Sequence, residues 1–166
     1  MQVPSPTDPA AMLDRLLDDS LSDQRGLGAW QSLIRAHASL MRELATDLVT
    51  KTGLTLGDFD VLAQLALGGG ELRMTDLAAR AFSSRSGMTR RVDRLVEEGL
   101  VRRSPADGDA RGVVVALTDA GVARLREALP VHLQRVSELF SERLDDQELD
   151  VLERALQKVT PDCSFG

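Results

Sequence analysis

Residues 83–117 read SSRSGMTRRVDRLVEEGLVRRSPADGDARGVVVAL and combine three local patterns. Serines that can cap a helix precede a run with helical spacing, and Gly99 ends that run. Two stretches with strand character follow, Leu100–Ser104 and Val113–Leu117, around the polar loop Pro105–Gly112. The helix carries four arginines and the loop carries one more, namely Arg85, Arg90, Arg91, Arg94 and Arg111. A basic helix followed by a basic hairpin suits the two grooves of duplex DNA.

Charge is distributed unevenly along the chain. Residues 71–112 hold nine arginines and seven carboxylates, a balance of +2, whereas the remaining residues have a balance of −8. The formal net charge of −6 therefore does not exclude a nucleic-acid partner, because a binding face is local. A run of charges can equally be an ordinary solvated surface, so the charge pattern alone leaves both interpretations open.

Size and composition predict a single, mainly helical globular domain. The chain has 166 residues, 43% of them hydrophobic, and the hydrophobic residues recur at helical rather than alternating spacing. No apolar run approaches the roughly 20 residues that cross a bilayer, and the N-terminal sequence lacks the pattern of a signal peptide. A lone cysteine, Cys163, agrees with a reducing compartment. We expect a cytoplasmic protein that does not contact a membrane.

Helical patterns precede the 83–117 segment. We predict a short helix opened by Asp8-Pro9, a break near Gly26 and Gly28, and two longer helices over Trp30–Val49 and Leu56–Leu67. Glycines should end both, at Gly53 and at Gly68-Gly69-Gly70. A short helix capped by Thr75 and ending near Ala81 then leads into the helix capped by Ser83 or Ser84. Two helices joined this tightly indicate a helix-turn-helix.

Helical patterns also follow the hairpin. Thr118 restarts the helical spacing, and Pro130 should kink that helix because it removes one backbone hydrogen bond. Asp145, with Glu148 three residues later, is typical of a capping box that opens a last helix. The chain should therefore end in two amphipathic helices.

The helix of residues 85–98 has two distinct faces at 100° per residue. Its buried stripe should contain Met88, Val92, Leu95 and Val96, and its opposite face should contain Ser86, Arg90, Arg94 and Glu97. Small residues at its N-terminus would allow a close approach to DNA, with Arg90 able to fork to a guanine and Arg94 better suited to a phosphate. The alternative is an ordinary surface helix, since its carboxylates partly neutralise the arginines.

The run SSRSGMTRRVDRLVEEGLVRRSPADGDARGVVVALTDAG resembles the recognition helix, wing and following helix start of the MarR family of bacterial transcription regulators. The resemblance covers roughly residues 26–158. It implies a mainly α fold: a winged helix-turn-helix with a small β-hairpin wing and a helical dimerisation region formed by N- and C-terminal helices. One domain over 1–166 is expected, with 1–49 and 119–160 as the dimerisation region and 54–118 as the winged lobe.

The resemblance also implies a DNA-binding site. The recognition helix would enter the major groove and the wing arginine the minor groove, which implies contacts from Ser84, Ser86, Thr89, Arg90, Arg94 and Arg111. A basic residue commonly precedes the wing arginine in this family, whereas here Ala110 stands there, which predicts weaker binding by the wing than is usual. A homodimer implies a pseudo-palindromic operator with half-sites about 34 Å apart.

MarR-like regulators often release DNA when a small aromatic or phenolic acid binds. Four residues that could line such a site are Trp30, His37, Phe59 and Asp60. The stronger alternative places Trp30 and Phe59 in the core or an interface and makes His37 a satisfied, half-buried histidine. The expected N-terminal helix resembles an extension found in the urate-responsive branch of the family.

Other functional classes have less support. His37 and His132 are the only histidines and lie on different predicted helices, so no metal spacing appears, and Cys163 has a carboxylate neighbour that disfavours a thiolate. No nucleophile arrangement or phosphate-binding loop indicates an enzyme, and no cofactor is expected. The leading hypothesis is a homodimeric, ligand-responsive repressor that binds double-stranded DNA. The alternative is a dimeric helical interaction protein with weak or lost DNA binding.

Overall fold

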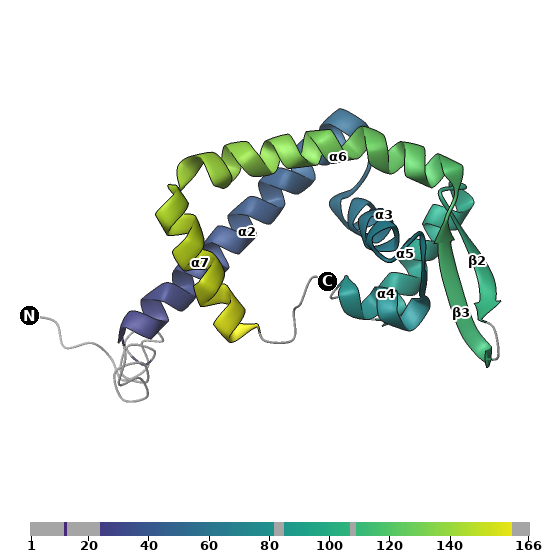
Figure 1. Cartoon of the computed structure of the whole chain (residues 1–166), viewed down its shortest axis with the longest axis horizontal. Helices are drawn as coiled ribbons and strands as arrows, with labels where there is room; N and C mark the ends of the chain where they lie inside the picture. Colours follow the sequence, from purple (N-terminus) through teal and green to yellow (C-terminus); the bar gives the residue numbers. More distant parts are fainter. Residues whose placement is uncertain (1–11, 13–23, 82–84, 107–108, 161–166) are drawn as a thin grey trace, which may run out of the picture. The chain divides into compact units, whose positions relative to one another are not determined.

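The computed structural model describes residue 12 and residues 24–81, 85–106 and 109–160 (Figure 1). The chain divides into two units, residues 1–42 and residues 43–166. Apart from residue 12, the predicted N-terminal helix lies outside the described residues, as do Ser83 and Ser84 with their predicted cap.

Helix α2 (Gln24–Thr52) is longer than the sequence pattern predicts. The expected break near Gly26 and Gly28 is wrong, because both glycines lie inside α2. A glycine inside a helix costs only about 1 kcal/mol relative to alanine, and the long run of helix formers that follows outweighs it. The predicted end of the helix is confirmed, since Gly53 adopts a φ of 72° directly after Thr52.

Three helices and a small sheet make up the winged lobe, the part of the 43–166 unit between Leu56 and Leu117. Helix α3 (Leu56–Leu67) has the predicted bounds and is capped by the Thr55 side chain. Helix α4 (Met74–Arg80) begins two residues earlier than expected and has Arg73, not Thr75, at its N-cap. This correction has a structural reason: strand β1 (Glu71–Arg73) leads directly into α4, so the chain already turns at Arg73. Helix α5 (Arg85–Glu97) follows.

The sheet has three antiparallel strands in the order β1-β3-β2. Strands β2 (Val101–Ala106) and β3 (Asp109–Leu117) pair from Val101↔Leu117 to Ala106↔Asp109, with an irregularity between Pro105 and Ala106. The predicted eight-residue loop is therefore wrong. The backbones of the two strands stay paired through residues of that segment, whose side chains lack the alternation of polar and hydrophobic residues that indicates a strand. Strand β1 was not predicted at all; its three residues pair with Val114–Ala116.

The C-terminal part contains α6 (Asp119–Leu139), the short 3₁₀ helix η1 (Ser141–Arg143) and α7 (Asp146–Val159). The predicted restart of the helical pattern at Thr118 is confirmed, and the Thr118 side chain caps α6. The predicted capping box of Asp145 and Glu148 is also confirmed. Two contacts connect helix α6 to the last turns of α2. Nη2 of Arg135 lies 3.3 Å from Oε2 of Glu43, and the Arg124 guanidinium donates to the Thr52 carbonyl oxygen.

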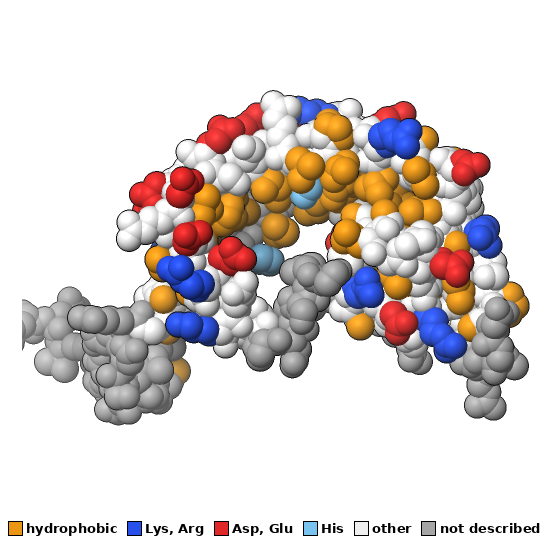
Figure 2. Space-filling view, in the orientation of Figure 1, with side chains coloured by type: hydrophobic (Ala, Val, Ile, Leu, Met, Phe, Trp, Pro, Cys, Tyr) orange, Lys and Arg blue, Asp and Glu red, His pale blue; other side chains and the backbone are white. Residues whose placement is uncertain are grey.

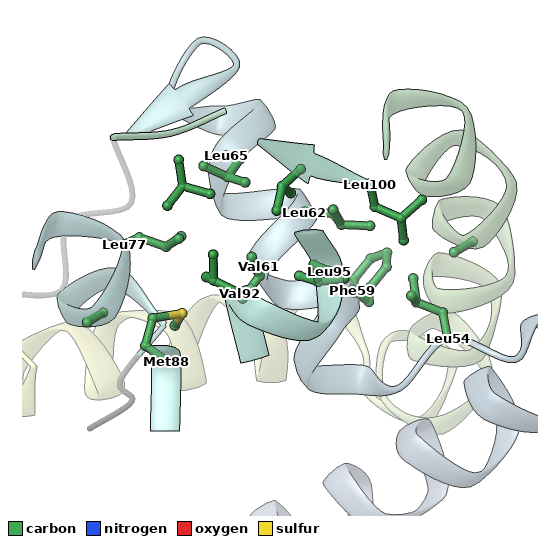
Figure 3. Packing of buried hydrophobic residues seen from close by; sticks show 14 of the residues in the cluster. Leu54, Phe59, Val61, Leu62, Leu65, Leu77, Met88, Val92, Leu95 and Leu100 are labelled. Carbon is green, nitrogen blue, oxygen red and sulfur yellow. The ribbon is translucent and has the colours of Figure 1, made fainter. Parts of the chain in front are cut away.

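The hydrophobic core lies between α3, α4, α5 and the sheet (Figure 3). Met88, Val92 and Leu95 of α5 are fully buried, as predicted, and meet α3 and α4 residues such as Leu62 and Leu77. The expected burial of Val96 is wrong, because its side chain is 38% exposed. Val96 lies at the edge of the helical stripe, about 100° from Leu95, and so turns out of the core.

Large hydrophobic side chains remain exposed on both long helices. On α2 they include Trp30, Leu33, Ile34 and Met41, and on α6 they include Val122, Leu129 and Leu133. Figure 2 shows hydrophobic side chains gathered along α6. In the described parts of the chain, no helix is both long and apolar enough to cross a membrane.

Candidate nucleic-acid interface

Helix α5 presents a polar face away from its buried stripe. Ser86, Thr89 and Arg90 are exposed on this face, while Met88 and Val92 anchor the opposite side in the core. Apart from Val96, the predicted separation of these two faces is therefore confirmed for the described residues, and Ser84 lies outside them. A firmly packed helix with small and hydroxyl side chains near its start can bring its backbone and Arg90 close to a nucleic acid.

Arg94 is exposed, as predicted, with its side chain 47% accessible, but it is engaged by a partner on another helix. Its guanidinium Nη2 lies 2.5 Å from Oδ1 of Asp58, a residue of α3 that is only 4% exposed. The hydrogen bond to Asp58 raises the pKa of Arg94. The Asp58 carboxylate is buried and needs a positive partner, and Arg94 can supply one while its side chain stays 47% exposed. A 100° helical wheel cannot show such a partner on another helix. A DNA contact by Arg94 stays a prediction.

Asp58 also binds groups other than Arg94. It accepts from the Thr55 hydroxyl at 2.5 Å and from Arg91 at 3.5 Å. The guanidinium of Arg91 packs against the first turn of α3, where a Cβ on Gly57 would overlap it. Asp58 was not predicted as a functional residue. One local pattern could have identified it: Thr55 is followed three residues later by an acidic residue, which is typical of the first turn of a helix.

The wing carries Arg111 on strand β3, not in a loop. Ala110, which stands where the family commonly has a basic residue, lies on the same strand next to Arg111. Figure 2 shows basic and acidic side chains interspersed over the winged lobe, which agrees with its nearly balanced charge in the sequence. Binding there would depend on a few placed arginines rather than on a uniformly positive surface.

The four residues proposed for an effector site fall into both units. Trp30 and His37 are exposed residues of α2 in the 1–42 unit, so the alternative of a half-buried His37 is wrong for the single chain. Phe59 and Asp60 belong to α3 in the 43–166 unit. Phe59 is 6% exposed and part of the core, which confirms its alternative interpretation.

A half-buried cluster surrounds Asp60. The ring of Phe59 lies 4.5 Å, centroid to centroid, from the ring of His132 on α6. Burial raises the pKa of Asp60, against an opposing hydrogen bond with Gln64 and the charges of Arg91 and His132. Burial lowers the pKa of His132, which therefore favours its neutral form, while Asp60 acts in the opposite direction. The place of His132 in this cluster was not predicted from the sequence, because His132 lies more than 70 residues from Phe59 and Asp60 along the chain.

Within the residues that the structure describes, no group of three or more His, Cys, Asp or Glu side chains could hold a metal ion.

A winged helix with an exposed, basic recognition helix defines a DNA-binding protein of the winged helix-turn-helix class. A family model described as MarR family matches residues 52–112. An uncharacterized HTH-type transcriptional regulator of Bacillus cereus is 30% identical over 130 residues, which are 78% of this chain and 85% of that protein. The chain belongs to the MarR family of transcription regulators, which are not enzymes.

Two further relatives bear on the site. The crystal structure of Sco3205, a MarR family transcriptional regulator from Streptomyces coelicolor, was solved in complex with DNA. It is 30% identical, with a TM-score of 0.76 over 88% of this chain and 93% of that chain. The HTH-type transcriptional repressor YetL of Bacillus subtilis is 32% identical over 105 residues, 63% of this chain and 62% of that protein.

Proposed function

We propose that this protein is a homodimeric repressor that binds a pseudo-palindromic operator and leaves it when a small aromatic or phenolic ligand binds. The observation that carries the proposal is the exposed face of α5, where Ser86, Thr89 and Arg90 stand above a fully buried stripe. The DNA complex of Sco3205 supports a DNA partner, and the similarity to the repressor YetL supports repression.

The DNA contacts divide by groove. Arg90 would read a guanine in the major groove, while Ser84, Ser86 and Thr89 would let the start of α5 approach phosphates closely. Arg111 on β3 would enter the minor groove. Arg94 would contribute mainly by holding α5 on Asp58, with a phosphate contact only if it leaves that partner.

Two copies would supply two recognition helices. The exposed hydrophobic residues of α2 and α6 would become buried in such a dimer. This would explain why a chain with a net charge of −6 carries so many exposed hydrophobic side chains. A two-fold dimer places its recognition helices on half-sites about 34 Å apart.

The effector would bind near Asp60. The cluster offers an aromatic ring, a mostly neutral histidine and a carboxylate whose pKa is raised, and the charge of Arg91 on α5 acts on that carboxylate. A ligand that changes the charge around Arg91 would act directly on the recognition helix. A contribution from Trp30 and His37 stays a prediction from the sequence.

The test is selection of preferred DNA from a random pool, repeated with aromatic acids and phenols. Enrichment of a pseudo-palindrome that declines with one of these compounds is the expected result. No enriched sequence, with weak and salt-insensitive binding, would instead support a helical interaction protein that has lost DNA binding. A palindrome unaffected by every compound would keep the DNA-binding part and remove the effector part.

Replacing Arg90 with alanine should weaken operator binding by about 1–3 kcal/mol and relax the preference at one base pair, because a bidentate contact to a base is lost. Binding isotherms on the selected operator and on its single-base variants measure both effects. Arg126→Ala is the matched control, since it removes one exposed arginine from α6, which is not part of the winged lobe. Equal affinities for the Arg90→Ala and Arg126→Ala proteins would contradict the base contact.

Replacing Arg111 with alanine should weaken binding to all sequences to a similar degree. The slope of log K against log salt should fall by about one unit if Arg111 neutralises one phosphate. Titrations at several salt concentrations measure this slope. Ala110→Arg adds a charge at the neighbouring position and should raise the slope. A wild-type slope in the Arg111→Ala protein would remove the wing from the DNA interface.

A further inference from the structure

Strand β2 is connected to the recognition helix by one arginine. Arg103 places Nη1 2.5 Å from Oδ1 of Asp93 and Nη2 3.2 Å from the carbonyl oxygen of Thr89. Asp93 and Thr89 lie one helical turn apart on α5, so a single guanidinium donates hydrogen bonds to the helix at two points. The Arg103 side chain is 31% exposed and the Asp93 side chain 48% exposed.

We infer that Arg103 is a positioning residue that sets the orientation of the recognition helix relative to the wing. The inference rests on the proposed DNA-binding function and adds to it a residue that need not touch DNA. Two nitrogens of the Arg103 guanidinium are engaged by α5, which leaves this side chain poorly placed to serve as a phosphate contact.

The contact joins the two elements that would enter the two grooves. The Thr89 carbonyl belongs to the peptide bond that leads into Arg90, the expected base contact. On the other side of the hairpin, Arg103 pairs in register with Val115 of β3, the strand that carries Arg111. A shift of β2 against α5 would therefore change the spacing between Arg90 and Arg111.

The opposite flank of α5 is held in a similar way. Asp58 of α3 binds Arg91 and Arg94, residues that alternate along the helix with those held by Arg103. With the stripe of Met88, Val92 and Leu95 buried below, α5 is gripped by α3 on one flank and by β2 on the other. The hydrophobic core fixes the depth of the helix, and these two contacts limit its rotation and sliding.

A partly exposed ion pair contributes little to folding stability. Correct placement of several contacts at once is more sensitive, because a small displacement of one group weakens all of them. Loss of the Arg103 contact should therefore affect DNA binding more than it affects folding.

The decisive variants are Arg103→Ala and Asp93→Asn, measured by operator titration at several salt concentrations together with thermal denaturation. Both should weaken operator binding about tenfold, since preorganisation of the two reading elements is lost. Asp93→Asn is the sharper of the two, because it removes a negative charge close to DNA. A purely electrostatic effect would strengthen binding, whereas loss of positioning weakens it. The double variant should bind no more weakly than Arg103→Ala alone.

The salt slope separates positioning from direct contact. Arg103→Ala should keep the wild-type slope, while a fall of about one unit would show a phosphate contact and overturn the inference. Tighter binding by Asp93→Asn, or a double variant that shows the summed losses of the two single variants, would overturn it as well. If Arg103→Ala does not fold, Asp93→Asn still decides the matter. A wild-type protein that binds no operator would contradict the proposed function itself.

Discussion

Replacing Arg94 with alanine is expected to lower the free energy of unfolding by about 2–3 kcal/mol, because it leaves the buried Asp58 carboxylate without its nearest cation. Arg91 remains at 3.5 Å and the Thr55 hydroxyl at 2.5 Å, so the loss should lie below that of a fully unpaired buried charge. Urea unfolding followed by circular dichroism measures the change.

The same variant decides between two roles of Arg94. If Arg94 only holds α5 on α3, the salt slope of operator binding should stay at the wild-type value. Arg90→Ala is the matched control, since Arg90 is exposed one turn earlier on α5 and should have little effect on unfolding. An Arg94→Ala protein with wild-type stability and a slope lowered by about one unit would instead restore the phosphate contact predicted from the sequence.

Replacing Gly121 with alanine should lower the free energy of unfolding by about 2–3 kcal/mol, although alanine is the better helix former. A Cβ at this position would overlap the carbonyl oxygen of Leu100, a backbone atom that no side-chain rotation can move. That carbonyl also accepts from the Thr118 amide and hydroxyl, so a shift would disturb the cap of α6. Gly121 thus fixes the close approach of α6 to the start of β2.

Gly28→Ala is the control for this prediction. Gly28 lies inside α2, and apart from its chain neighbours and the backbone of its own helix no atom of the described residues lies within 4 Å of the position that an alanine methyl group would take. Alanine should therefore stabilise the protein there by about 0.5–1 kcal/mol. The two glycine-to-alanine changes should act in opposite directions in urea unfolding. A stable Gly121→Ala protein would show that α6 can move away from the sheet at small cost.

Local signals in the sequence determined much of the helical architecture. Gly68 ends α3, Thr118 opens α6, and Asp145 with Glu148 opens α7, as predicted. Each of these signals works through hydrogen bonds to backbone groups within four residues, so the chain needs no distant partner to express them. The buried stripe of α5 could be predicted for the same reason, because helical geometry alone places Met88, Val92 and Leu95 on one side.

Tertiary structure decided which polar side chains are engaged within the protein. Asp58 takes Arg94 from 36 residues away, Arg103 takes Asp93 and the Thr89 carbonyl, and His132 reaches the ring of Phe59. It also added β1 at the edge of β3. The sequence predicts the faces of a helix, but ion pairs and strand partners depend on which elements the hydrophobic core brings together. For this reason Arg90 could be assigned to the exposed face of α5 from the sequence, while the contacts that hold α5 in place became visible only in the folded chain.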